Sequence, residues 1–253
     1  MPIMATILYR DTFNFFRNKF ADIILLALLT ALISVMLGCY ALAPAPISDQ
    51  LISLDNKAEF EILSKISLKQ IIEHMSIDQQ IILLKTSAAG TFAGLVGNAL
   101  LTGGLLTMIR FLSNKRSISV LGAIVLSVRL LPRLLLLIFI TTLLVQLGLL
   151  LVVVPGFLLS IAFSLSPVIA TIDNIGVMRS IRASTEIAFA NIRLISPAVL
   201  FWMLAKTAVL LLVTPFMICH PILTAVLLNL LSNLISSLLL IYLYRLYMQL
   251  RVV

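Results

Sequence analysis

The chain has 253 residues, of which 61% are hydrophobic and only 11% are charged. A soluble domain carries about 25% charged residues, so too few charges remain here to cover a surface that faces water. The composition excludes a soluble globular domain and a disordered chain, and it predicts an all-α, polytopic membrane helix bundle.

Six apolar runs are candidates to cross about 30 Å of hydrocarbon, which takes about 20 residues of helix; the fourth is shorter and reaches across only if it is tilted little. They define about six transmembrane helices in a single membrane domain, at residues 23–42, 88–109, 134–154, 157–172, 194–213 and 222–243. Between the third and fourth runs, Pro155-Gly156 is a typical turn sequence. We therefore expect a tight hairpin there.

The first run resembles a secretory signal, because basic residues precede it and it ends in Ala41-Leu42-Ala43. However, it is longer than the roughly 7–15 residues of a signal core. Pro44 would also directly follow the cleavage site. We expect an uncleaved first span.

Three segments combine arginine with apolar residues directly before a span: residues 7–19, 117–133 and 177–193. This pattern is typical of an amphipathic helix that lies in the head-group layer. Phe16-Arg17-Asn18 also echoes Phe189-Ala190-Asn191. The sequence thus indicates an internal repeat, in which an interfacial helix precedes a hairpin of two spans. Whether residues 117–133 lie on the membrane or span it stays open.

The basic residues alternate with the spans. Thirteen of the 18 Lys and Arg residues flank the spans on one side, and the other side holds Lys57, Lys65, Lys69 and Lys85. Because cytoplasmic connections carry an excess of Lys and Arg, we expect both termini in the cytoplasm of a bacterial cell with the chain in its inner membrane. Basic residues placed in this way report topology, so we expect no nucleic-acid partner.

The segment 43–87 is the one long connection on the outer side. Ser76 and Gln79 have the spacing of a helix-capping box, so we expect a helix to start there and to lead into the second span. Cys39 and Cys219 also fall near this side. They are either two free thiols or a disulfide, and the sequence does not decide between these alternatives. His74 and His220 alone are too few to predict a metal site.

Polar residues inside the spans are the candidate functional or packing residues. Lys206 is a cation deep in the fifth span, and intramembrane charges are functional candidates by default. Asn229, Ser232, Asn233 and Ser236 recur at helical spacing and form one polar stripe on the sixth span. Such stripes usually join helices by hydrogen bonds, and a water-lined path is the alternative. Asn98 and the small residues Gly90 and Gly94 predict close packing of the second span.

Catalytic signatures are missing from the sequence. It contains no G-x-S-x-G, P-loop or H-E-x-x-H motif, and we expect no enzyme, no cofactor and no metal. The expected partners are membrane lipids and other inner-membrane proteins. The candidate contacts to lipid head groups are arginines of the interfacial segments: Arg17, Arg116, Arg133, Arg179 and Arg182.

Several stretches resemble the YciC family of uncharacterised enterobacterial inner-membrane proteins. They are Tyr9–Asn18, Leu151–Gly156, Leu204–Thr207, Asn229–Ser236 and Ile241–Met248. The resemblance extends over nearly the whole chain and implies a multi-pass protein of the inner membrane. It implies no activity. The leading hypothesis is therefore a protein that supports envelope organisation through lipid or protein contacts, and the alternative is a small transporter or channel.

The predicted orientation can be tested with reporters. Alkaline phosphatase fused after Lys115 should be inactive, and green fluorescent protein fused there should fluoresce, because the positive-inside bias places this segment in the cytoplasm. A fusion within residues 43–87 should show the opposite pattern. An exported reporter after Lys115 would contradict the topology.

Overall fold

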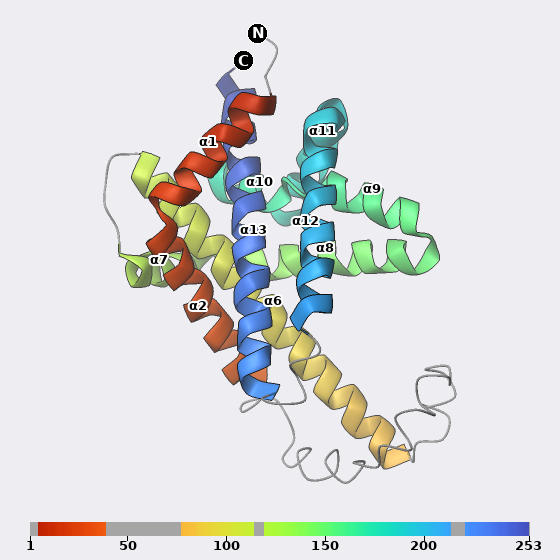
Figure 1. Ribbon diagram of the computed structural model, residues 1–253. Helices are drawn as coiled ribbons and strands as arrows, with labels where there is room; N and C mark the ends of the chain where they lie inside the picture. The colour runs from red at the N-terminus through yellow and green to blue at the C-terminus, as the bar shows by residue number, and fades with distance from the viewer. Residues whose placement is uncertain (1–4, 39–76, 114–118, 214–220, 253) are drawn as a thin grey trace. The chain divides into compact units, whose positions relative to one another are not determined.

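The computed structural model describes residues 5–38, 77–113, 119–213 and 221–252, and in these residues it is helical (Figure 1). The chain divides into two compact units, one comprising Met1–Val35 and Leu95–Val253 and the other Met36–Gly94. The helices are α1 (Ala5–Asn18), α2 (Phe20–Met36), α6 (Ile77–Ser113), α7 (Val120–Ser127), the 3-10 helix η2 (Val128–Leu130), α8 (Leu131–Leu151), α9 (Val153–Phe163), α10 (Ser166–Ile172), α11 (Val177–Ala190), α12 (Ile192–Val213) and α13 (Pro221–Val252).

The polytopic helical architecture predicted from composition is confirmed. Among the described residues, five helical segments are long and apolar enough to cross a membrane, and α1 with α2 forms a sixth candidate that is bent by 77°. Helix α12 matches the fifth predicted span within two residues at its start. Helix α13 continues nine residues beyond the predicted end at Leu243, and Tyr244 and Tyr247 in this extension are buried against the protein.

The segment 117–133 does not form the separate amphipathic helix that we expected. The described part begins with α7, whose N-terminus is capped by Ser119, and η2 then leads directly into α8. The candidate span accordingly covers Val120–Leu151, and only 22% of its most apolar 18-residue stretch is buried. Apolar side chains on both sides suit a helix surrounded by lipid better than one lying on the membrane surface.

The turn of the α8–α9 hairpin lies at Val152 and not at Pro155-Gly156. Val152 has extended backbone angles between the two helices, and α9 already includes Pro155 in its first turn. Proline is tolerated there because the first N–H groups of a helix have no partner within it. Gly156 instead lets the helices approach, since a Cβ on it would lie 2.6 Å from the backbone nitrogen of Leu149.

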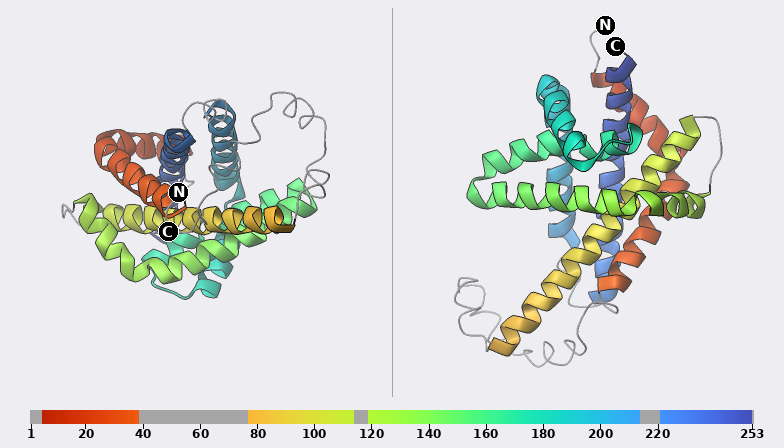
Figure 2. Two further views of the ribbon diagram at one scale, coloured as in Figure 1. Left: turned by 90° about the horizontal axis from the view of Figure 1, so that it is seen from below. Right: turned by 180° about the vertical axis from the view of Figure 1, so that it is seen from behind.

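Figures 1 and 2 show α8 and α9 side by side, running across the direction of α13. The two candidate spans that contain these helices, Val120–Leu151 and Val154–Ile172, are identified by their length and composition. The crossing of the membrane by residues 134–154 and 157–172 therefore stays a prediction. Within the fourth segment, the break between α9 and α10 precedes Pro167, the second residue of α10, which lacks the N–H that a continuous helix would bond to the carbonyl of Phe163.

The two matching segments noted in the sequence both lie at a helix break. Helix α1 ends at Asn18 and α2 begins at Phe20, while α11 ends at Ala190 and α12 begins at Ile192. The side chain of Asn191 donates to the carbonyl of Ile187 at 3.0 Å and so satisfies a carbonyl of the last turn of α11. A 14-residue helix followed after a short break by a longer apolar helix thus occurs twice among the described residues, and the interfacial position of the shorter helices stays a prediction.

The core of the larger unit surrounds the C-terminal half of α13. Residues 240–244 and Leu246 and Tyr247 of this helix are buried, together with Leu8 of α1 and Leu165 of α10. Helix α13 contacts α12, α1 and α10, and α11 contacts α9 and α10 (Figure 2). In the smaller unit, α6 begins at Ile77, directly after the predicted cap residue Ser76.

The α8–α9 contact generates a prediction about stability. A Cβ on Gly148 would lie 2.9 Å from Cα of Gly156, which is closer than real contacts allow. Gly148→Ala and Gly156→Ala should therefore each lower the thermal unfolding midpoint of the purified protein, because the helices must move apart and lose packing, at a cost of about 1–3 kcal/mol.

Gly94→Ala is the matched control, since within the smaller unit nothing outside its own helix lies within 4 Å of a Cβ there. This change should leave the midpoint unchanged or raise it slightly, because alanine favours helix by up to about 1 kcal/mol over glycine. Equal midpoints for Gly156→Ala and Gly94→Ala would contradict the close approach.

Candidate functional site: the Asp173 cluster and its cavity

A group of polar residues meets where α10 ends and the chain turns toward α11. Asp173 is the C-terminal cap of α10, and Asn174 follows it with a φ of 52°. Asparagine tolerates this left-handed conformation better than most residues. The turn places both side chains next to α8 and α13. We call Asp173, Asn174, Arg133, Tyr247 and Arg251 the Asp173 cluster.

Asp173 connects this turn to the end of α13. Its Oδ2 accepts a hydrogen bond from the hydroxyl of Tyr247. Its Oδ1 lies 3.0 Å from Nη1 of Arg251, in a contact that does not have hydrogen-bond geometry, so the two groups interact mainly through their charges. The carboxylate is 24% exposed, whereas the Arg251 side chain is 56% exposed. Arg251 is therefore held in place while its outer part stays accessible.

Arg133 connects the same turn to the start of α8. Its Nη1 donates to Oδ1 of Asn174 at 2.8 Å, and its Nη2 donates to the carbonyl of Ala170 at 3.0 Å. A cation at the last carbonyls of a helix is favourable because the C-terminus carries partial negative charge. Arg133 thus stabilises the end of α10.

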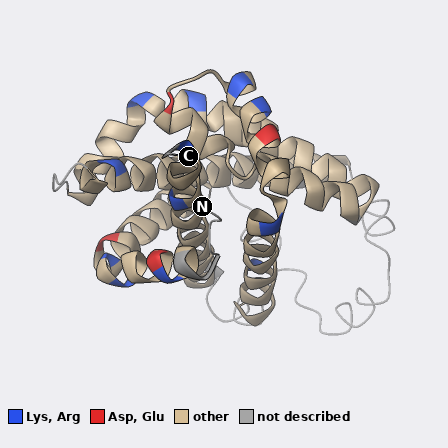
Figure 3. Ribbon diagram, turned by 90° about the horizontal axis from the view of Figure 1, so that it is seen from above, with Lys and Arg blue, Asp and Glu red and all other residues tan. Residues whose placement is uncertain are grey.

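A second ion pair joins α13 to α1. Nη1 of Arg245 lies 3.2 Å from Oδ2 of Asp11, and the guanidinium lies 5.3 Å from the ring centroid of Phe15. Figure 3 shows charged residues on the helices around the two chain termini. The larger unit therefore carries a charged region at the end where α1 begins and α13 ends.

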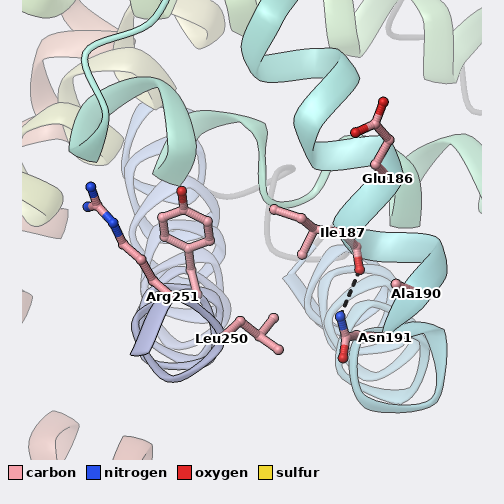
Figure 4. A pocket seen from close by; sticks show the side chains of 7 residues that line it. Glu186, Ile187, Ala190, Asn191, Leu250 and Arg251 are labelled. Atoms are coloured by element: carbon pink, nitrogen blue, oxygen red, sulfur yellow. Dashed lines mark hydrogen bonds between the residues drawn. The ribbon is translucent and has the colours of Figure 1, made fainter. Parts of the chain in front are cut away.

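A cavity of about 420 Å³ lies beside the Asp173 cluster, between α11 and the end of α13. It is lined by Glu186, Ile187, Ala190, Asn191, Tyr247, Leu250 and Arg251. Figure 4 shows Arg251 on the α13 side and Glu186 on the α11 side, with Leu250 and Ile187 between them. The cavity thus has an apolar middle and opposite charges at two of its edges.

The arginines predicted to contact lipid head groups fall into two groups. Arg17, Arg179 and Arg182 are exposed, and Arg182 pairs with Glu186 one helical turn away at 3.2 Å. Arg133 is instead half-buried and engaged by the turn after α10. Arg116 lies outside the described residues. The contacts of Arg133 indicate a structural role, and the three exposed arginines remain candidates for lipid contact.

The polar stripe of the sixth span is used partly in helix contacts. Nδ2 of the buried Asn233 donates to Oγ1 of Thr30 at 3.1 Å and lies 3.3 Å from the carbonyl of Ala27, both on α2. Asn229 donates to the carbonyl of Ala225 in its own helix at 2.9 Å. These contacts favour a packing role. Ser232 and Asn98 are both half-buried.

Lys206 lies next to the only tryptophan of the chain. Its Nζ is 4.6 Å from the ring centroid of Trp202, a distance typical of a cation–π contact. The indole nitrogen of Trp202 lies 3.4 Å from Oγ of Ser236 on α13, which is a long hydrogen bond. The cation is thus partnered within α12, and Ser236 takes part in the α12–α13 contact.

Several predictions concern residues that the structure does not describe. Cys39, Cys219, His74 and His220 and most of the segment 43–87 lie outside the described residues. Across the described ranges, no three His, Cys, Asp or Glu side chains gather as a metal ion would require.

The sequence did not identify Asp173 and Tyr247 as a pair. No local spacing connects these two residues, which lie 74 positions apart in the chain.

The helices and their charged end define a polytopic helical membrane protein without a recognisable catalytic centre in its described part. Comparison of the whole sequence with family models places residues 1–249 in an uncharacterised protein family, UPF0259. The chain belongs to this family.

Relatives from enterobacteria match over the full length. A UPF0259 membrane protein of Sodalis glossinidius, SG1383, is 65% identical over 251 residues, covering 99% of both chains. One from Serratia proteamaculans is 52% identical and covers 99% of this chain and 100% of its own. One from Yersinia pestis is 49% identical over 99% of this chain and 97% of its own. No solved structure matches the chain. The enterobacterial membrane family expected from the sequence is therefore confirmed.

The Asp173 cluster generates a prediction about stability. Asp173→Ala should lower the free energy of unfolding by about 1–3 kcal/mol, because it leaves the largely buried Tyr247 hydroxyl without its acceptor. Thermal unfolding of the purified protein in detergent measures the change. Arg182→Gln is the control, since an exposed i,i+4 pair contributes only about 0.3–0.5 kcal/mol. Equal effects of the two changes would show that Asp173 does not hold α13.

Proposed function

We propose that the protein supports organisation of the bacterial inner membrane by binding phospholipid head groups, without catalysing a reaction. The observation that carries this proposal is the two-sided character of α11. One face presents the exposed side chains of Arg179 and Arg182, whereas Ser180, Ser184 and Ala188 are buried on the other.

The buried face of α11 is fixed to its neighbour. The hydroxyl of Ser184 donates to the carbonyl of Ala162 in α9 at 2.6 Å. This contact keeps α11 in one orientation, so its arginines face outward. A juxtamembrane Lys or Arg near anionic lipids contributes about 1 kcal/mol to membrane attraction. An oriented pair of arginines at the end of a membrane bundle is thus suited to gather anionic lipids.

The alternative of a transporter or channel has less support. Its candidate residues Asn233 and Ser236 contact neighbouring helices, and Lys206 lies against Trp202. Groups used in this way are poorly placed to line a path for water or ions. A non-catalytic role is likewise the simpler proposal, because the described carboxylates Asp11, Asp22, Asp173 and Glu186 are all paired with basic residues.

Lipid co-purification tests the proposal. The double variant Arg179→Ala and Arg182→Ala should retain less phosphatidylglycerol and cardiolipin than the wild type, by up to about 30-fold if each arginine contributes about 1 kcal/mol. Native mass spectrometry of protein extracted in a mild detergent gives the amount of bound lipid in the variant relative to the wild type. The variant Arg179→Lys and Arg182→Lys keeps the charge and should retain most of the anionic lipid. If the alanine variant retains as much as the wild type, these arginines do not bind lipid.

A further inference from the structure

We propose that the cavity between α11 and α13 is a binding site for the head group of a phosphatidylethanolamine-type lipid. In this site, Arg251 faces the phosphodiester and Glu186 faces the primary ammonium. The inference rests on the proposed lipid-binding function and adds a selective site to the non-selective attraction of the exposed arginines.

The size and lining of the cavity fit such a ligand. Its volume of about 420 Å³ lies within the range of small-molecule sites, about 300–1,000 Å³. The side chains of Ile187, Ala190 and Leu250 lie between the two charged edges and provide an apolar surface for the two methylene carbons that join the phosphate to the ammonium. A purely ionic ligand would gain nothing from this surface.

The positive edge of the cavity is held ready for a phosphate. Asp173 holds one Nη of Arg251, and the Tyr247 hydroxyl in turn fixes the position of Asp173. A guanidinium has five N–H donors, so the contact to Asp173 leaves donors for a second anion. With its side chain 56% exposed, Arg251 can reach a phosphodiester without giving up its partner.

The negative edge suits an ammonium group. Glu186 pairs at 3.2 Å with Arg182, and their side chains are 68% and 85% exposed. Such a pair is weak because water screens it, so a ligand ammonium can replace Arg182 at little cost.

Complementary charges at two edges select among head groups. An ethanolamine ammonium donates hydrogen bonds to Glu186, whereas the quaternary ammonium of a choline lipid has no N–H to donate. A phosphatidylglycerol head group would bring only negative charge near Glu186 and would be disfavoured there. The cavity is therefore expected to prefer phosphatidylethanolamine to both, in contrast to the exposed arginines of α11, which favour anionic lipids.

Competition between lipids with identical acyl chains tests this site. The full-length protein is exchanged in detergent with equal amounts of phosphatidylethanolamine, phosphatidylcholine and phosphatidylglycerol, and bound lipid is counted by native mass spectrometry. The wild type should retain at least fivefold more phosphatidylethanolamine than phosphatidylcholine. Glu186→Gln should abolish this preference without lowering the amount of bound phosphatidylglycerol. Leu250→Trp should reduce phosphatidylethanolamine by filling the cavity, with the helix content checked by circular dichroism.

The variants separate the two proposals. The double variant Arg179→Ala and Arg182→Ala should lose phosphatidylglycerol but keep the preference for phosphatidylethanolamine. A wild type without that preference, or a Glu186→Gln variant that keeps it, would overturn the cavity site. Those results do not depend on retention of anionic lipid. The proposed function is therefore tested separately, by the loss of anionic lipid from the double variant.

Discussion

Hydrocarbon provides no hydrogen-bond partners, and this constraint determines most of the structure. Every polar group that enters the membrane needs a partner within the protein. Asn233 therefore bonds to α2 and the Tyr242 hydroxyl donates to the carbonyl of Leu194 in α12 at 2.8 Å. Both contacts originate on α13, so this helix connects neighbours that contribute few polar groups themselves. The stacking of Tyr9 on Tyr242, with ring centroids 4.9 Å apart, adds α1 to the same arrangement.

At the charged end of the larger unit, ion pairs and hydrogen bonds of charged side chains hold the helices. Asp173 and Asn174 receive contacts from α13 and α8, and Arg245 pairs with Asp11 of α1. Individually, exposed ion pairs of this kind contribute little. Their value here is geometric: the contacts of Asp173 and Asn174 fix the turn between α10 and α11 and so position α11 beside the end of α13, whereas the Arg245–Asp11 pair joins α13 to α1. The cavity exists because these two helices are held close but not in full contact.

The long spans could be predicted from sequence because hydrophobic length is a local property. Helix α12 follows from its apolar run, and α1 and α11 follow from their mixture of arginine and apolar residues. The turn at Val152 could not be located, because Pro155 is compatible both with a turn and with the first turn of a helix. The Asp173–Tyr247 contact was also inaccessible, since it depends on how α13 packs and not on any spacing along the chain.

Helix α11 connects the two kinds of lipid contact through a single ion pair. Glu186 lines the cavity, and its partner Arg182 is one of the exposed arginines. An ammonium that binds Glu186 would free Arg182 for an anionic neighbour, and an anionic lipid that binds Arg182 would free Glu186 for an ammonium. Because coupling between two binding sites is reciprocal, each lipid would favour the other. The pair is weak, so the coupling should be small, and it would bias which lipids lie side by side around the protein without holding them permanently.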